Sequence, residues 1–116
     1  MAIGYSPITW DIAKGSLTRG AWAKESETGR ALRVTLAVNG LLVTPDTETL
    51  KLRYKGTGGV YGSTAGVIVD GAYNIELDGA VAGQVGDVQA DLELTADGKT
   101  ISSPIFEIPV YDSIGI

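Results

Sequence analysis

The sequence contains neither cysteine nor histidine. Without cysteine, the fold can use neither disulfide bonds nor thiolate metal ligands. Without histidine, it lacks the side chain that most often serves proteins as a general base and as a metal ligand. We therefore expect no metal site and no cofactor, and any catalytic centre would have to rely on other residue types.

Long apolar runs are also missing from the 116 residues. No stretch approaches the roughly 18 consecutive apolar residues of a membrane-spanning helix. The opening residues 1–5 lack the basic and apolar regions of a secretory signal. The sequence therefore predicts a protein that is made in the cytoplasm and has no membrane partner.

Basic residues are scarce in the second half of the chain. Residues 1–58 hold eight of the nine Lys and Arg and five acids, a net +3, whereas residues 59–116 hold one base and nine acids, a net −8. The total of −5 argues against nucleic acid as a partner. If the halves stay apart in the fold, their opposite charges favour head-to-tail packing of copies, and if they interleave, the surface is simply acidic.

The composition that remains is typical of one globular domain covering residues 1–116. Hydrophobic residues make up 44% of the chain and charged residues 20%, which is enough apolar material for one core. The sixteen glycines are dispersed between short apolar runs, as turns require.

Apolar and polar residues alternate along most of the chain, which is the pattern of half-buried β-strands. The alternating or apolar segments are 8–12, 32–38, 41–44, 50–55, 67–69, 73–77, 87–94 and 106–110. The clearest hairpin signals between them are Asn39-Gly40, Asp70-Gly71 and Asp97-Gly98, because type I′ turns need positive φ at both central residues.

Proline and glycine add further boundaries. Pro45 is expected to end the strand at 41–44, and Pro109 indicates that the last strand lies at an edge or ends there. The best helical candidate, residues 79–84, is bracketed by glycines and predicts one turn at most. The sequence thus predicts an all-β fold, an antiparallel β-sandwich of immunoglobulin-like or jelly-roll-like type with seven to eight short strands.

Two glycine motifs resemble nucleotide-binding loops but lack the residues that these loops need. Gly98-Lys99-Thr100 has Glu93 where a phosphate-binding loop needs glycine, and a strand is expected where that loop needs a helix. The stretch 56–62 has Tyr61 at the third glycine position of a dinucleotide fingerprint and no surrounding βαβ unit. We interpret 56–62 as a flexible hairpin loop.

Charged side chains line two of the predicted strands. Asp87, Asp91 and Glu93 project from one face of a strand, where they diverge instead of converging on a cation, so a solvated sheet face is the preferred interpretation over acid–base or calcium chemistry. Lys51, Arg53 and Lys55 form a basic stripe that can lie opposite acids on a neighbouring strand. No serine has a lysine in a recognisable catalytic spacing, so we expect no enzymatic activity.

The aromatic residues are the best candidates for protein contacts. Trp10 and Trp22 flank a polar stretch, residues 14–20, and either ring can anchor the core or serve as a binding hot spot. The last residues, 111–116, can be a frayed end, a cover for a neighbouring subunit or the cut end of a longer chain. The interface candidates, taken from these segments and from the 56–62 loop, are Trp22, Tyr61, Tyr111, Ile114 and Ile116.

The order of these features resembles the N-terminal domain of upper baseplate proteins from tailed phages of Gram-positive bacteria. The resemblance covers roughly residues 8–110 and rests on the segments 9–14, 31–36 with Asn39-Gly40, 71–77, 86–94 and 99–108. It implies a sandwich that docks onto the central core of a phage tail and has no catalytic residues. In that family the chain continues towards receptor-binding modules, and this sequence stops where the continuation would begin.

The expected function is therefore structural: a virion protein that docks or multimerises in a phage tail or baseplate. Its expected partners are other phage structural proteins and copies of itself. Two alternatives stay open, a capsid decoration or head-fibre protein and a carbohydrate-binding module. Exposed aromatic rings in a row would favour sugar binding, whereas burial of Trp10 and Trp22 would count against it.

Overall fold

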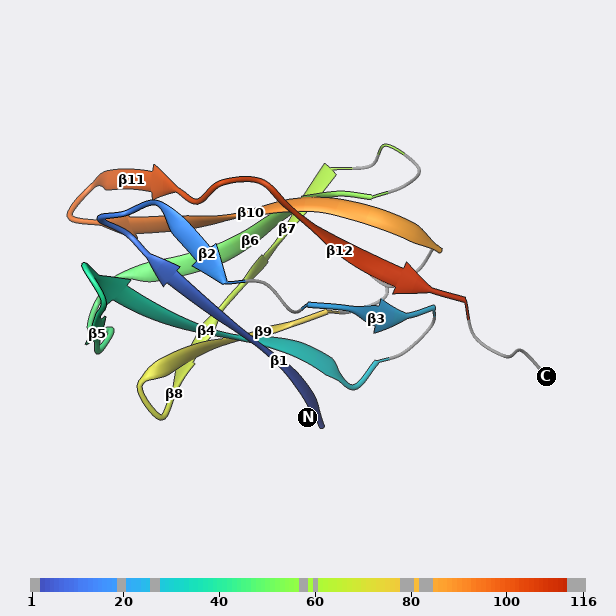
Figure 1. Cartoon of the computed structure of the whole chain (residues 1–116), viewed down its shortest axis with the longest axis horizontal. Coiled ribbons are helices and arrows are strands. Elements are labelled where there is room, and N and C mark those ends of the chain that lie inside the picture. The colour runs from blue at the N-terminus through green and yellow to red at the C-terminus, as the bar shows by residue number, and fades with distance from the viewer. Residues whose placement is uncertain are drawn as a thin grey trace.

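The structure, a computed structural model, describes residues 3–18, 21–25, 28–56, 59, 61–77, 81 and 85–112. In these residues the chain forms twelve strands in two six-stranded sheets that pack face to face (Figure 1). The strands are β1 (Gly4–Asp11), β2 (Ser16–Thr18), β3 (Ala23–Lys24), β4 (Arg30–Val38), β5 (Leu41–Val43), β6 (Thr49–Lys55), β7 (Tyr61–Ala65), β8 (Val67–Val69), β9 (Ala72–Glu76), β10 (Gly86–Ala96), β11 (Lys99–Ser102) and β12 (Phe106–Tyr111).

Each sheet consists of five strands in a row and a sixth strand that pairs with one of them outside this row. Sheet A has the order β2-β1-β4-β9-β8, and β5 pairs with the end of β4. Sheet B has the order β3-β12-β10-β6-β7, and β11 pairs with β10. The predicted β-sandwich is therefore confirmed, although with twelve strands where the sequence predicted seven to eight.

Most neighbouring strands are antiparallel, as predicted, but two pairs are parallel. β1 runs parallel to β4 over its whole length, and β3 runs parallel to the end of β12. Parallel neighbours need a crossover connection. Here the chain leaves β1, forms β3 at the edge of sheet B and returns to sheet A as β4. Alternation cannot reveal this path, because it shows that a strand has a buried face but not which strand pairs with it.

The three predicted hairpin turns are present and have the predicted backbone conformation. The φ angle is 51° at Asn39, 50° at Asp70 and 51° at Asp97, and the glycine that follows each has φ between 75° and 84°. These turns connect β4 to β5, β8 to β9 and β10 to β11. All three lie at the end of the molecule opposite the C-terminal end of β12 (Figure 1).

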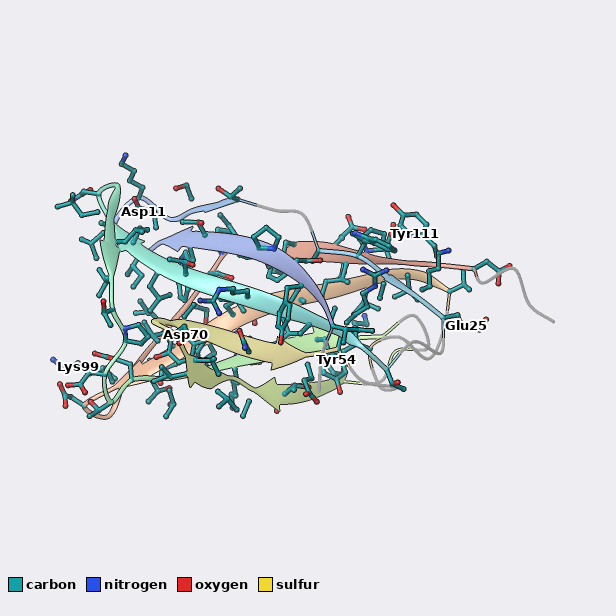
Figure 2. The ribbon with its side chains drawn as sticks, turned by 90° about the horizontal axis from the view of Figure 1, so that it is seen from below. Asp11, Glu25, Tyr54, Asp70, Lys99 and Tyr111 are labelled. Carbon is teal, nitrogen blue, oxygen red and sulfur yellow. The ribbon has the colours of Figure 1, made fainter. Side chains whose placement is uncertain are left out.

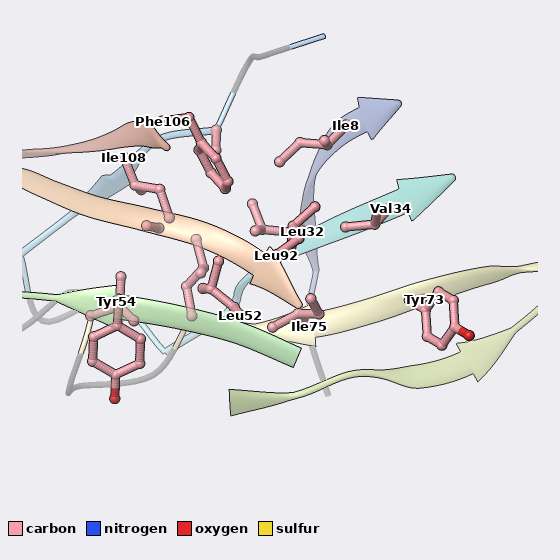
Figure 3. Packing of buried hydrophobic residues seen from close by; sticks show 14 of the residues in the cluster. Ile8, Leu32, Val34, Leu52, Tyr54, Tyr73, Ile75, Leu92, Phe106 and Ile108 are labelled. Atoms are coloured by element: carbon pink, nitrogen blue, oxygen red, sulfur yellow. The ribbon is translucent and has the colours of Figure 1, made fainter. Parts of the chain in front are cut away.

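The core lies between the sheets and is built from the apolar positions of the alternating strands (Figure 3). In β10, for example, Val88, Ala90, Leu92 and Leu94 are buried, as the alternation predicts. The largest fully buried side chains are Trp10, Tyr73, Phe106, Ile8, Leu32, Leu50, Leu52, Ile75, Leu77, Leu92, Ile108 and Val34.

The sequence missed β2, β3 and β7, whereas β11 follows the Asp97-Gly98 turn, where a strand was expected. β2 and β3 have three and two residues, too few to show a period; β2 lies in the polar stretch 14–20 and β3 directly follows Trp22. The predicted loop at 56–62 also ends early, because Tyr61 and Gly62 begin β7. Glycine, serine and threonine dominate the middle of that strand, so its apolar signal is weak. In the segment 79–84 the structure describes Val81 alone, in a helical conformation, and the other residues lie outside the described part.

Pro109 lies in β12, which is not the outermost strand of sheet B. β3 covers the outer edge of β12 only at Val110 and Tyr111, so the edge beside Pro109 is open in the described chain. The prediction of an edge position is thus right for that stretch of the strand, where a missing N–H costs no ladder hydrogen bond.

β7 and β8 close one side of the sandwich. β7 is the last strand of sheet B and β8 is the last strand of sheet A, and only Gly66 separates them. The N–H of Gly66 donates to the carbonyl oxygen of Leu50 at 2.8 Å, and a Cβ at this glycine would lie 3.2 Å from the same oxygen. Glycine thus allows the chain to pass from one sheet to the other in direct contact with the core.

Candidate interaction surface

The structure brings two of the predicted interface residues together. β3 and β12 run side by side, so that Trp22, just before β3, lies near Tyr111 at the end of β12. The centroids of the two rings are 6.1 Å apart and the rings are tilted by 56°. The guanidinium carbon of Arg30 lies 3.9 Å from the centroid of the Trp22 ring, within the range of a cation–π contact. We call Trp22, Arg30 and Tyr111 the Trp22 cluster.

A shallow hollow of about 410 Å³ adjoins the Trp22 cluster. Its walls are Ala21, Trp22, Pro109 and Tyr111, none of which carries a charge. Tyr111 is 54% exposed and Trp22 is half-buried. Figure 2 shows Tyr111 and Glu25 towards one end of the molecule, with Asp11, Asp70 and Lys99 towards the other. An aromatic hollow beside a fixed guanidinium has the composition of a protein-binding hot spot.

Backbone hydrogen bonds hold the cluster in place. The N–H of Glu25 donates to the carbonyl oxygen of Tyr111 at 2.9 Å, which extends the β3–β12 pairing. Arg30 begins β4, and its side chain also packs against Gly4, where a Cβ would lie 2.9 Å from Nη1. Sequence reasoning missed Arg30, because its neighbours come from β1 and from the segment before β3.

Tyr61 lies elsewhere, at the start of edge strand β7. Its side chain is 75% exposed, and the Lys55 ammonium lies 5.6 Å from its ring centroid. Both residues border an open groove of about 630 Å³ on sheet B, whose other walls include Ser63, Gln89 and Ile105. The structure thus separates Tyr61 from Trp22 and Tyr111. The two remaining candidates, Ile114 and Ile116, lie outside the described residues.

The basic stripe of β6 faces the acids of β10, as the sequence suggested. Arg53 donates to both carboxylate oxygens of Asp91, at 2.8 and 2.6 Å, and also lies 2.9 Å from Glu93. Lys51 lies 3.2 Å from Glu93. The hydrogen bonds to Asp91 raise the pKa of the Arg53 guanidinium above its ordinary value. This face of sheet B is therefore a ladder of paired charges.

The acids of β10 do not gather into one cluster. Asp87, the third acid of that face, lies opposite Pro109. Over the residues that the structure describes, no three carboxylates gather as a metal site requires. Nor does any helix in that part of the chain have the length and apolar character of a membrane crossing.

Asp11 is a buried carboxylate that sequence reasoning treated only as part of a strand. It accepts hydrogen bonds from the backbone N–H groups of Lys14, Asn39 and Gly40, at 3.1, 3.0 and 2.7 Å. Burial raises the pKa of Asp11, but these three donors and the charge of Lys14 together lower it below its ordinary value. Asp11 thereby fixes the turn before β2 to the β4–β5 hairpin.

The β4–β5 hairpin carries a second surface that sequence reasoning missed. Leu41 and Leu42 are 75% and 73% exposed, and they directly follow the turn that Asp11 holds. Among the described residues β5 pairs with β4 alone, and neither leucine belongs to the core cluster. A short run of consecutive apolar residues is typical of a fully buried strand, so the sequence pattern pointed away from this exposed surface.

The sequence matches no protein-family model and no curated protein sequence. Among solved structures, the chain is similar to the N-terminal domain of ORF48 of phage TP901-1, with a TM-score of 0.65. The similarity covers 96% of this chain and 99% of that domain, at 12% sequence identity. At this identity the similarity concerns the fold.

Proposed function

We propose that the chain is a non-enzymatic structural protein of a phage particle, which docks in the tail or baseplate. The observation that carries the proposal is the fold, which matches the N-terminal domain of a phage protein over nearly the full length of both chains. The order of sequence features independently resembles a phage baseplate domain. Because one fold can serve many functions, the role itself must come from surfaces that can hold a partner.

The Trp22 cluster is the surface that best fits docking onto another protein. It combines two aromatic rings, a guanidinium and an uncharged hollow, the residue types that dominate binding energy at protein interfaces. A partner that inserts an apolar side chain into the hollow would bury the exposed part of Tyr111. The expected partner is another structural protein of the particle.

Immunogold electron microscopy of particles tests this function. Antibodies raised against the purified chain are expected to label the tail or its tip. Labelling of heads would support a capsid decoration protein instead, and the absence of the chain from purified particles would contradict a virion role altogether.

Variants assembled into particles test the docking surface. We expect Trp22→Ala and Tyr111→Ala to reduce incorporation of the chain about tenfold or more, as the loss of a hot-spot residue does. Ile101→Ala is the control, because Ile101 is an exposed apolar residue on β11, outside the cluster. Equal incorporation of all three folded variants would exclude the Trp22 cluster as the docking surface.

The carbohydrate-binding alternative has less support. Trp10 is buried in the core, and Arg30 covers one face of the Trp22 ring. In the groove on sheet B, Tyr61 is an exposed ring on which a sugar could stack. Nuclear magnetic resonance titration with cell-wall saccharides would revive this alternative if the residues around Tyr61 shifted and the rest of the chain did not.

A further inference from the structure

The outer edge of the β7–β8 segment is open and unprotected. Each strand has one described neighbour, β6 for β7 and β9 for β8, so residues 61–69 pair along one side only. These nine residues contain no charged residue and no proline. Natural proteins usually protect such an edge with a charge, a proline, a bulge or a very short strand, because it can pair with another chain.

The other open edges of the described chain are protected or short. β2 and β5 have three residues each, and the edge strands β3 and β11 contain Lys24 and Lys99. The open stretches of β1 and β12 contain Pro7 and Pro109. The edge of β7 is therefore the exception that needs an explanation.

The hydrogen bond at Gly66 shows which groups of β7 face outward. The N–H of Gly66 bonds to the carbonyl oxygen of Leu50, so Gly66 and Leu50 form a hydrogen-bonded pair of the β6–β7 ladder. In an antiparallel ladder, hydrogen-bonded pairs alternate with pairs that are not hydrogen-bonded. The backbone groups of Gly62 and Thr64 then point towards β6. Those of Tyr61, Ser63 and Ala65 point away from the sheet, and all three of these residues are exposed.

We propose that β7 pairs antiparallel with β7 of a second copy of this chain, about a twofold axis through Ser63. This register places Ser63 opposite itself, Tyr61 opposite Ala65 and Gly62 opposite Thr64. The outward groups of Tyr61, Ser63 and Ala65 then meet one another and form about six main-chain hydrogen bonds. The result is one continuous sheet across two copies of sheet B.

The side chains of β7 fit a second copy because no pair in this register is unfavourable. The large ring of Tyr61 faces the small Ala65 of the partner strand, and the serine hydroxyls at the axis can bond to each other. On the inner face, Gly62 leaves room for the Tyr54 ring, whose Oη would lie 2.6 Å from a Cβ at that position. A strand without charge avoids the like-charge contacts that self-pairing would create on any charged edge.

The charges next to β7 do not oppose the dimer. Arg53 and Lys51 are paired with acids of β10, and Lys55 lies beside the Tyr61 ring. The two β6 strands would be separated by three strand spacings, about 14 Å. This exceeds the screening length of about 8 Å at physiological salt. A twofold pairing also uses the β7 edge of both copies, so association through it closes at two.

Sedimentation velocity over a concentration series tests the dimer. We expect the chain to be a dimer at high concentration, and we expect Ser63→Lys, which puts two lysines opposite each other at the axis, to raise the dissociation constant about tenfold or more. Ser16→Lys, which adds the same charge to the exposed edge of β2, is the control. A chain that stays monomeric throughout, or a Ser63→Lys chain that dimerises like the control, would overturn the proposal.

A cysteine cross-link tests the register directly. Because the chain has no cysteine, Ser63→Cys supplies a single thiol. The Cα atoms of a hydrogen-bonded antiparallel pair are about 5.5 Å apart, within the range that a disulfide spans. We expect mild oxidation of dilute Ser63→Cys to give covalent dimers, with Ser16→Cys staying mostly monomeric. Equal cross-linking of the two would exclude this register.

Both experiments use the purified chain, whereas the role in a phage particle is tested on particles. The dimer can therefore be rejected while that role stands, and that role can be rejected while the dimer stands. Far-UV circular dichroism of each variant separates loss of pairing from loss of folding.

Discussion

Asp11 is a single carboxylate that satisfies the backbone of two turns at once. Its Oδ1 accepts from Lys14 and Asn39, and its Oδ2 accepts from Gly40. Because these hydrogen bonds are partly buried, removing their acceptor leaves N–H groups that water satisfies only in part, and this costs stability.

The pH dependence of stability is the measurement that isolates Asp11. Because its pKa is lower in the folded chain than its ordinary value of 3.8, Asp11 stabilises the fold above about pH 4, and this contribution is lost as the pH falls towards the folded-state pKa. We expect Asp11→Asn to lower the urea midpoint at pH 7, and the difference from the parent chain to shrink below pH 3.8.

Asp87→Asn is the control for this experiment, because it removes a carboxylate from an exposed position of β10. The assigned role of the carboxylate would be wrong if Asp11→Asn had the urea midpoint of the parent chain at pH 7. It would also be wrong if the difference in midpoint were the same at pH 7 and below pH 3.8.

Gly62 is a second residue whose identity is dictated by one neighbour. In the cross-strand pair between β6 and β7, the Tyr54 ring lies over Gly62. A Cβ there would lie 2.6 Å from Oη and 2.7 Å from Cζ of the ring. Covering an edge glycine with an aromatic ring is a known way to fix the register of a sheet.

We therefore expect Gly62→Ala to destabilise the fold by about 1–3 kcal/mol, the usual cost of forcing an extra carbon into a packed site. Urea denaturation measures the change, with Ser16→Ala as an exposed edge control expected to stay within about 0.5 kcal/mol. Replacing Tyr54 by leucine should reduce the cost of Gly62→Ala. An equal cost in both backgrounds would mean that the ring is not responsible.

Among the elements, the hairpin turns follow most directly from the sequence. Asp97 adopts a φ of 51°, a left-handed conformation that costs most residues about 1–2 kcal/mol and that Asn tolerates well. At this exposed site we expect Asp97→Val to destabilise by about 1–2 kcal/mol or more and Asp97→Asn to be neutral. Thermal unfolding of both variants checks this, and equal stability of the two would argue against a left-handed residue at this turn.

The strands that could be predicted are those with enough residues to show a period. β10 has eleven residues and β4 has nine, and both show their buried face in the sequence. β2 and β3 are too short for a pattern, and β7 has glycine and small polar residues where a central strand would have large ones. All three are edge strands, which gain less from burial and therefore carry less apolar signal.

The candidate site was predictable only in part, because a site depends on contacts between distant segments. Trp22 and Tyr111 could be chosen as sparse aromatic residues, yet their contact depends on the parallel pairing of β3 with β12. Arg30 had no local sign of its contact with Trp22, and β7 begins inside the loop predicted at 56–62 and was not itself predicted.

At the scale of the whole molecule, both sheets mix the two halves of the sequence. β8 and β9 complete sheet A, which otherwise comes from the first half, and β3 and β6 lie in sheet B among strands from the second half. The bases of β6 consequently face the acids of β10. The net +3 and −8 of the two halves therefore do not form opposite poles, and charge alone gives no reason for head-to-tail packing of copies.

The same mixing predicts that the described chain unfolds as one unit. The buried residues of both sheets form one core cluster, so neither sheet can keep its buried face covered without the other.

The two tryptophans report on different sheets: Trp10 on sheet A from within the core, and Trp22 beside β3 of sheet B. We expect tryptophan fluorescence and far-UV circular dichroism to give coincident urea transitions, with an m-value of about 1–2 kcal/mol per molar. Trp22→Phe leaves Trp10 as the single tryptophan. In this variant we expect the urea midpoint from fluorescence to equal the urea midpoint from circular dichroism. Two separated transitions would instead mean that the two sheets unfold independently, which a shared core does not allow.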